Sequence, residues 1–288
     1  MRFCGINHAI VGLVKCDMLK RTLTGAVLVA IVVGFFLLRN VNSALFLILL
    51  GAVCIVGNFE MNKMLGDKTC NAQKIISLLF AVSLAPCVNF FGGTGALVSF
   101  AIFAIAEFFV PVFKKGNLSI ESLALGFLSL IYPALVLVPM MLINALGEVS
   151  LFALVLIFAV SCCADVFAYL VGMALKGPKL CPQISPKKTV SGAIGGLLGG
   201  VIGAIVCFAF LKHTFNYHLT TSPYLYFAIV GLVGALLTEL GDLVESFIKR
   251  SLNVKDSGKI FPGHGGMLDR FDGIMFCSVF IWMVTALF

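Results

Sequence analysis

The chain has 288 residues, of which 60% are hydrophobic and 11% charged, whereas soluble globular domains average about 25% charged residues. This composition excludes an ordinary water-soluble enzyme and predicts an all-α polytopic integral membrane protein, a class in which glycines, here 29, are common. The net charge of +7 then indicates topology rather than a nucleic-acid partner.

Apolar stretches predict about nine transmembrane helices, because one crossing needs about 20 residues. They cover approximately residues 22–38, 44–58, 75–91, 95–113, 123–144, 150–172, 192–211, 224–244 and 274–288. The first follows Lys20 and Arg21, as a signal peptide would, but no small-residue cleavage site precedes Arg39, so we expect a retained signal anchor. We expect an N-terminal transmembrane region, 1–145, with about five spans and a C-terminal catalytic region, 146–288, with about four.

The distribution of Lys and Arg orients these helices. With the N-terminus in the cytoplasm and the C-terminus external, 18 of the 20 Lys and Arg fall in cytoplasmic segments, and only Arg39 and Lys212 lie outside. The positive-inside rule favours this arrangement. It places two long polar loops, 173–191 and 245–273, in the cytoplasm.

Carboxylates stand at both ends of the longer loop. Asp242 lies in the preceding span, with Glu239 and Glu245 on the same helix face, and Asp269 and Asp272 lie where the loop enters the last span. Acids at membrane depth are costly unless they face a partner, a metal or water, so each is either functional or a buried acid satisfied by a neighbouring helix. Oxygen ligands from two helix ends would suit Mg²⁺, which shares its coordination shell with substrate phosphates.

Between these acids lies a glycine-rich turn, Pro262-Gly263-His264-Gly265-Gly266, whose backbone N–H groups can approach a ligand closely. Five basic residues surround it: Lys249, Arg250, Lys255, Lys259 and Arg270. Glycines, bases and paired acids together suit a nucleoside triphosphate with Mg²⁺. Two simpler readings stay open, a plain loop for the turn and the positive-inside rule for the bases.

The shorter loop repeats this pattern. Asp165 and Tyr169 lie one helical turn apart before it, and the segment Ser185-Pro186-Lys187-Lys188-Thr189 precedes a helix expected to begin near Gly192. Hydroxyls, ammonium groups and a helix N-terminus can bind phosphate. The alternative is a basic surface loop that contacts anionic lipid.

The run from Ser246 to Asp272 resembles the signature of the phosphatidate cytidylyltransferases, also called CDP-diacylglycerol synthases. It shares Ser246, Lys249-Arg250, Lys255-Asp256, Gly258, Pro262, His264-Gly265-Gly266, Asp269-Arg270 and Asp272 with that signature. Gly241-Asp242, Asp165 and the Ser185–Thr189 segment are similar to other segments of the family, so the resemblance covers about residues 150–288. One departure is visible: Val190-Ser191 stands where the family commonly has Trp-Glu.

The resemblance implies transfer of the cytidylyl group of CTP to phosphatidate, giving CDP-diacylglycerol and pyrophosphate for phospholipid biosynthesis. It implies catalytic roles for Asp242, Lys249, Arg250, Lys255, Asp256, His264, Asp269, Arg270 and Asp272. It implies substrate binding by Asp165, Tyr169, Ser185, Lys187, Lys188, Thr189, Ser246, Gly265 and Gly266. The implied metal is Mg²⁺ on Asp242, Asp269 and Asp272, with a second cation left open.

Because phosphatidate cannot leave the bilayer cheaply, we expect the active site at the cytoplasmic face of a bacterial-type inner membrane. The expected partners are CTP, phosphatidate and membrane lipid, with a homodimer left open. Two other functions share parts of the pattern. A CTP-dependent lipid kinase would release CDP instead of pyrophosphate, and a transporter would carry polar residues in both halves as repeats.

Overall fold

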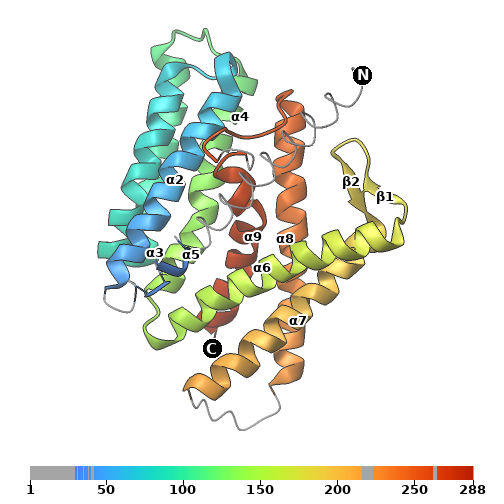
Figure 1. The fold of residues 1–288 in the computed structure, drawn as a ribbon. Coiled ribbons are helices and arrows are strands. Elements are labelled where there is room, and N and C mark those ends of the chain that lie inside the picture. The colour runs from blue at the N-terminus through green and yellow to red at the C-terminus, as the bar shows by residue number, and fades with distance from the viewer. Residues whose placement is uncertain are drawn as a thin grey trace, which may run out of the picture.

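The computed structural model describes residues 42–215, 223–261 and 265–287, together with scattered positions between 30 and 39. It is mostly helical (Figure 1). The elements in chain order are α2 (Ser43–Leu65), η1 (Gly66–Lys68), α3 (Asn71–Phe113), α4 (Ile120–Ser129), η2 (Leu130–Ala134), η3 (Leu135–Leu137), α5 (Val138–Asn144), α6 (Glu148–Leu175), β1 (Lys179–Cys181), β2 (Ser185–Thr189), α7 (Val190–Phe215), α8 (Tyr224–Ser251) and α9 (Leu268–Leu287).

Within these described ranges, six helical segments are long and apolar enough to cross a membrane: Ser43–Lys68, Asn71–Phe113, Ile120–Asn144, Val149–Leu175, Val190–Phe210 and Tyr224–Ser251. The chain is therefore built as a polytopic membrane protein. The predicted number of nine spans is not confirmed by this count. The expected first helix, 22–38, lies largely outside the described residues, and α9, which includes the expected span 274–288 up to Leu287, is not among the six.

Helix α3 supplies two of the expected spans because it folds back on itself. Gly92 has a φ of 59° and breaks the helix. The Ser83 and Ser99 hydroxyls are 2.7 Å apart, and the rings of Phe80 and Phe103 have centroids 5.7 Å apart. Residues separated by 16 positions would lie about 24 Å apart in a straight helix. The two arms therefore pack side by side, as the separate apolar runs 75–91 and 95–113 predict.

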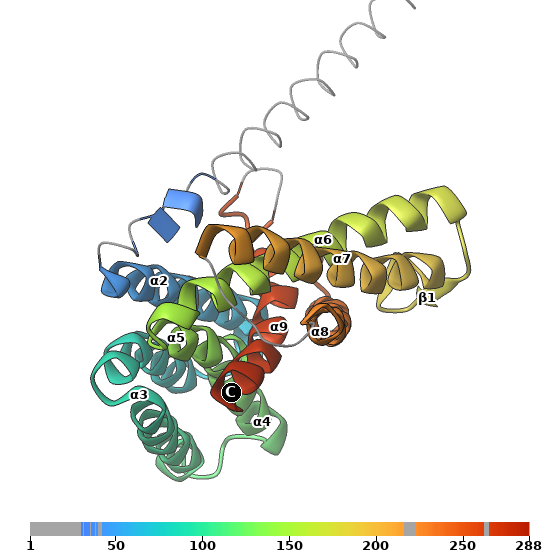
Figure 2. The same cartoon turned by 90° about the horizontal axis from the view of Figure 1, so that it is seen from below.

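Helix α9 lies in the middle of the molecule. Seen from below, helices α2 to α5 lie mainly on one side of it, α8 lies on the other, and α6 and α7 run past it along a third side (Figure 2). It packs against α5, α6 and α8. Helix α2 also reaches its first residue: a Cβ atom at Gly57 would lie 2.9 Å from the Leu268 side chain. Helix α2 thus contacts the start of α9.

Glycines allow α7 to lie directly on its two neighbours. A Cβ at Gly199 would lie 2.5 Å from the Cys163 carbonyl oxygen of α6, and one at Gly200 would lie 2.7 Å from the Gly231 carbonyl oxygen of α8. Small residues of this kind let helix backbones approach closely in membranes, where packing drives association. The close contact holds α6 and α8 in fixed positions around the site described below.

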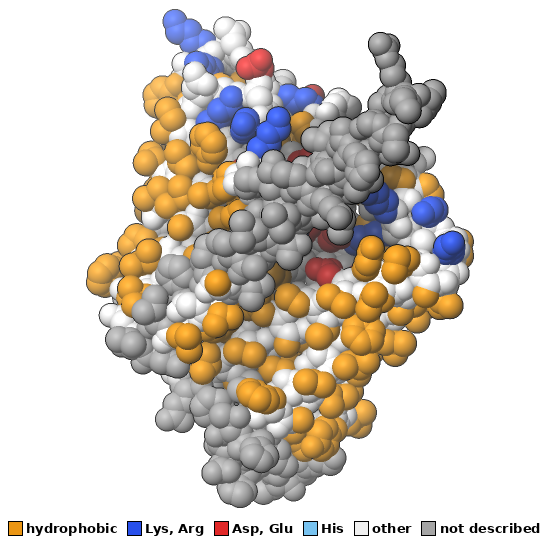
Figure 3. Space-filling model, in the orientation of Figure 1, with side chains coloured by type: hydrophobic (Ala, Val, Ile, Leu, Met, Phe, Trp, Pro, Cys, Tyr) orange, Lys and Arg blue, Asp and Glu red, His pale blue; other side chains and the backbone are white. Residues whose placement is uncertain are grey.

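The prediction of an all-α chain is wrong in one place. The expected loop 173–191 contains an antiparallel hairpin, in which Lys179 pairs with Thr189 and Cys181 with Ser185. In Figure 1 the hairpin lies toward the same end of the molecule as the α2–α3, α3–α4 and α8–α9 connections. On the face in Figure 3, Lys and Arg side chains gather at this end and near the hairpin, while the opposite half shows mainly hydrophobic ones.

Candidate active site

A cavity of about 1030 Å³ lies between α6, the hairpin, the first turn of α7, α8 and the start of α9. Most of the predicted site residues line it: Asp165, Tyr169, Lys187, Lys188, Thr189, Asp242, Lys249, Asp256, Asp269, Arg270 and Asp272. The structure therefore brings the two polar loops of the sequence together around one space. In Figure 3 acidic and basic side chains meet beside the hairpin.

Opposite charges pair across this cavity. The Lys188 ammonium of the hairpin lies 2.7 Å from the Asp242 carboxylate of α8. Lys249, also on α8, lies 2.5 Å from the Asp269 carboxylate and 3.3 Å from the buried Glu245. Each lysine is thus held in place by an acid, and a phosphate group entering the cavity would compete with these acids for the ammonium groups.

Asp269 is the most completely bonded acid of the site. Its Oδ1 accepts from Lys249, and its Oδ2 accepts from the backbone N–H groups of Ser257 and Gly266 at 3.0 and 2.7 Å and from the Ser257 hydroxyl at 2.9 Å. Burial raises the pKa of this carboxyl, but the hydrogen bonds from Lys249, Gly266 and Ser257 and the Lys249 charge outweigh burial and lower the pKa below its usual value. Asp269 therefore carries a fixed negative charge.

Thr189 stands where the hairpin passes into α7. Its hydroxyl accepts the Gly192 N–H at 3.1 Å, so it caps the helix N-terminus. The helix begins at Val190, two residues before the expected start. The Ser191 hydroxyl, at one of the positions that depart from the family pattern, accepts the Gly177 N–H at 3.2 Å and joins the end of α6 to α7.

Other predicted residues do not line the cavity. The Arg250 guanidinium donates to the Ile184 and Val254 carbonyl oxygens at 3.4 and 3.3 Å, and the Ser246 hydroxyl donates to Asp242 at 3.3 Å. Lys255 is exposed. Ser185, Gly265 and Gly266 are likewise absent from the cavity lining. His264 lies outside the described residues, as do Pro262 and Gly263.

Several residues that contribute to the observed site are not among the predicted site residues. The cavity is also lined by Lys176, Lys179 and Glu239. In the sequence, what points to these residues is that they belong to the same polar loop or span as the predicted ones. Glu60 of α2 is buried against the α8–α9 loop and accepts three hydrogen bonds from it. Glu60 lies just beyond the expected span 44–58, and nothing in the sequence connects it with a loop about 200 residues away.

The carboxylates that line the cavity are suited to bind Mg²⁺ in a site that stays open to substrate. In the part of the chain that the structure describes, no cluster of three or more His, Cys, Asp or Glu side chains forms a ready metal cage, and Asp269 has both oxygens engaged. Asp242 and Asp272 line the cavity with hard oxygen donors. Mg²⁺ commonly takes one or two carboxylates and completes its shell with water and phosphate oxygens. Asp242 also has both oxygens engaged, by Ser246 and Lys188, but its side chain is 34% exposed against 9% for Asp269. Asp242 and Asp272 are therefore the pair that fits that description, rather than a set of three.

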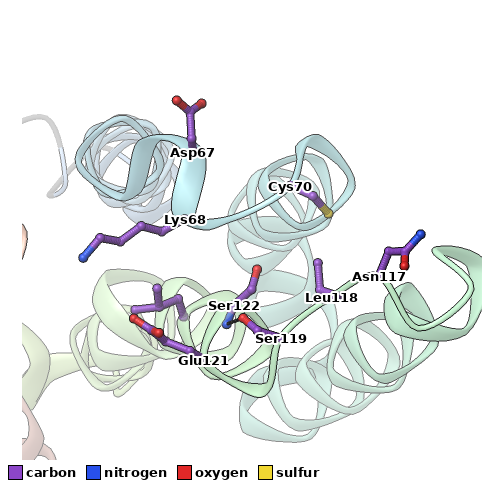
Figure 4. A pocket seen from close by; sticks show the side chains of 9 residues that line it. Asp67, Lys68, Cys70, Asn117, Leu118, Ser119, Glu121 and Ser122 are labelled. Carbon is purple, nitrogen blue, oxygen red and sulfur yellow. Dashed lines mark hydrogen bonds between the residues drawn. The ribbon is translucent and has the colours of Figure 1, made fainter.

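A second, smaller cavity of about 430 Å³ lies at the α2–α3 and α3–α4 connections. Asp67, Lys68, Ser119, Glu121 and Ser122 contribute to its wall, and the Asp67 carboxylate points away from Ser122 (Figure 4). Lys68 is the only basic residue among those that line it. It lacks the paired acids and lysines of the larger cavity.

Comparison with known proteins decides the family. The model of the cytidylyltransferase family matches residues 19–288. The phosphatidate cytidylyltransferase of Bacillus subtilis is 35% identical over 277 residues, which cover 94% of this chain and 99% of that protein. This chain belongs to the cytidylyltransferase family. The phosphatidate cytidylyltransferases of Rickettsia conorii and Rickettsia typhi are 35% and 38% identical, over 58% and 54% of this chain and 70% and 67% of theirs.

These matches extend further than the motifs alone indicate. The motif resemblance covers about residues 150–288, whereas the cytidylyltransferase match begins at residue 19 and the Bacillus relative aligns with nearly the whole chain. Helices α2 to α5 are therefore part of the family architecture, and their contact with the α8–α9 loop bears on the site.

Proposed function

We propose that this protein transfers the cytidylyl group of CTP to phosphatidate, forming CDP-diacylglycerol and pyrophosphate. The observation that carries the proposal is the cavity between the two polar loops, where lysines from the hairpin and from α8 pair with Asp242 and Asp269. It lies in a chain that aligns over almost its full length with a phosphatidate cytidylyltransferase.

The chemistry requires positioning and charge neutralisation more than a covalent nucleophile. A phosphate oxygen of phosphatidate attacks the α-phosphorus of CTP in line. The bond to the β-phosphate oxygen breaks and pyrophosphate leaves with that electron pair. Lys187 and Lys188 on the hairpin would hold one phosphate group, and Lys249 and Arg270, which also line the cavity, would hold the second.

Mg²⁺ is the metal we propose for this site, held by Asp242 and Asp272. When bound it would neutralise charge on the triphosphate. The two aspartates would keep its position fixed relative to the lysines, because Asp242 is on α8 and Asp272 on the first turns of α9. Asp269 would then serve the loop and Lys249 rather than the metal.

The rim of the cavity suits a lipid substrate. Tyr169 and Met173 of α6 line the cavity and are 67% and 55% exposed. Leu170 and Leu175 on the same helix end are exposed as well. Apolar side chains beside a charged cavity would let the phosphate head group enter while the acyl chains stay in the bilayer, because each buried CH₂ is worth about 0.8 kcal/mol.

We further propose nine spans in a bacterial-type inner membrane, with the N-terminus and the active site on the cytoplasmic side and the C-terminus external. The hairpin and the α8–α9 loop lie toward one end of the molecule with the other basic connections (Figure 1), in keeping with the positive-inside rule. Reporter fusions near Lys188 and Lys255 should be cytoplasmic and one near Tyr217 external. Fusions at Lys188 and Lys255 on opposite sides would contradict the cavity as a single site.

The decisive experiment follows the products. Purified protein in detergent is given CTP labelled in the α- or γ-phosphate, with phosphatidate in one reaction and diacylglycerol, whose hydroxyl a kinase could phosphorylate, in a second. Cytidylyl transfer moves the α-label into lipid and the γ-label into pyrophosphate. A CTP-dependent lipid kinase would move the γ-label into lipid and release CDP, and a transporter would produce neither product.

A further inference from the structure

A carboxylate from the first half of the chain lies under the α8–α9 loop. Glu60, near the end of α2, is 2% exposed. Its Oε1 accepts the Met267 N–H at 3.1 Å, and its Oε2 accepts the Leu268 N–H at 3.0 Å. The Ser257 hydroxyl also donates to Oε2, at 3.2 Å. Three donors of one loop thus converge on a side chain 197 or more residues away in sequence.

Two of these donors lie at the N-terminus of α9. Helix α9 begins at Leu268, where the first N–H groups have no partner within the helix. A carboxylate at this point satisfies them and interacts favourably with the helix dipole. Glu60 therefore caps α9 from another helix. The next two residues, Asp269 and Arg270, line the cavity.

Ser257 links Glu60 to the site. Its hydroxyl lies 3.2 Å from Glu60 Oε2 and 2.9 Å from Asp269 Oδ2, and its backbone N–H donates to the same Asp269 oxygen. Asp269 in turn holds the Lys249 ammonium at 2.5 Å. A chain of direct contacts therefore runs from α2 to a lysine in the cavity wall.

Two glycines of the loop make room for this carboxylate. A Cβ at Gly258 would lie 2.0 Å from Glu60 Oε1, and a Cβ at Gly266 would lie 2.5 Å from both Glu60 oxygens. No side chain fits at such distances without displacing Glu60. These glycines thus serve the approach of a side chain of the protein itself, whereas for the turn that includes Gly266 the sequence suggests the approach of a ligand.

We propose that Glu60 is a positioning residue of the active site, which sets the start of α9 and, through Ser257, the placement of Asp269 and Lys249. The proposal rests on the proposed cytidylyl transfer. Glu60 does not itself line the cavity, so it acts through the loop rather than on a substrate. It also gives the N-terminal helices a defined task in the reaction.

Glu60→Gln is the first test, because the amide keeps the shape but turns one acceptor into a donor that faces N–H groups. We expect kcat to fall about tenfold, with KM for CTP changed by less than about threefold, since the loop orients groups that act on bound substrate. Asn62→Ala is the matched control: it removes a buried side chain of the same helix that bonds Asn58 and Ser77 and not the loop. It should lower Tm and leave kcat unchanged.

A second test uses Gly258, where the three atoms closest to an added Cβ all belong to Glu60. Gly258→Ala should lower kcat about tenfold in the wild-type background. In a Glu60→Ala background the same substitution should change kcat by less than about twofold, because the clash is gone. Equal losses in both backgrounds would overturn the proposal.

A third readout is independent of turnover. Lys255 and Lys259 are exposed in the loop, and Lys114 and Lys115 are exposed in the distant α3–α4 connection. Limited trypsin digestion of Glu60→Gln should speed cleavage at the first pair and leave the second pair unchanged. Unchanged cleavage at Lys255 and Lys259, or a kcat within about twofold of wild type, overturns the positioning role. A wild-type protein that makes no CDP-diacylglycerol instead overturns the proposed function, while the digestion still decides whether Glu60 holds the loop.

Discussion

Buried polar groups differ in kind between the helices α2 to α5 and the helices α6 to α9. In the first set they are largely neutral and bond one another: Asn62 donates to Asn58 and Ser77, both at 2.9 Å, and Gln73 donates to the Ser122 carbonyl at 2.9 Å. In the second set neutral groups such as Ser161 and Thr238 are joined by buried charges that face or adjoin a cavity, as Lys249 and Glu245 do. Satisfied neutral networks hold helices together, whereas intramembrane charges are costly and mark function.

Removal of the metal should have the largest effect on activity, and it should distinguish the two sets of helices. If the carboxylates of the second set hold Mg²⁺, excess EDTA should abolish CDP-diacylglycerol formation, and added Mg²⁺ should restore it. The thermal stability of the substrate-free protein should change little, because the first set holds no charged cluster that needs a cation. Full activity in EDTA would remove the metal from the mechanism.

Asp242→Asn should have the next largest effect. The amide keeps the shape and loses the charge, so kcat should fall about 10²-fold or more, on the order of 3 kcal/mol of transition-state stabilisation. Asp242 is partly exposed, so folding should survive. Turnover and Tm are measured side by side, with Asp67→Asn at an exposed acid of the first set as the matched control. Near wild-type turnover of Asp242→Asn would contradict the assignment of Asp242 as a metal ligand.

Lys188→Met tests the cation that pairs with Asp242. We expect activity to fall about tenfold, because one group that neutralises phosphate is lost while the cavity keeps its other lysines. Stability should change by less than about 1 kcal/mol, since the ion pair is partly solvated. Lys188→Arg should recover part of the activity. A clear fall in Tm with turnover close to the wild-type value would make the pair structural instead.

The sequence predicts the meeting of the two polar loops because both motifs carry charge next to apolar runs. The structure agrees, since one cavity is lined by Asp165, Lys188 and Asp242. The sequence cannot predict the hairpin, because both strands are short and basic, with Pro182 directly after Lys179–Cys181 and Pro186 inside Ser185–Thr189. Nor can it predict that α9 begins at Leu268 rather than near 274, since the cap comes from Glu60 through tertiary packing.

Asn62→Ala should affect stability alone. The side chain donates to Asn58, Ser77 and the Lys74 carbonyl oxygen, and its loss leaves buried groups without partners, at about 1–3 kcal/mol. Unfolding of the purified protein in detergent should move to lower temperature. Below that temperature kcat should equal the wild-type value, and a fall in kcat would show that the neutral network also tunes the site.

Glu107→Gln should have the smallest effect, and it tests the second buried acid of the first set, besides Glu60. Glu107 is fully buried on the second arm of α3, where the Gln73 amide lies beside it and no cation pairs with it among the described residues. Gln has the same shape without a charge to desolvate, so the variant should be as stable as the wild type or more so, by less than about 1 kcal/mol. Turnover should stay within about twofold, because Glu107 is separate from the cavity that holds the paired lysines. The measurement is Tm and kcat for both proteins. A tenfold or greater loss of kcat with unchanged Tm would place a second functional carboxylate, besides Glu60, among the N-terminal helices, and the division between a scaffold and a reactive half would no longer hold.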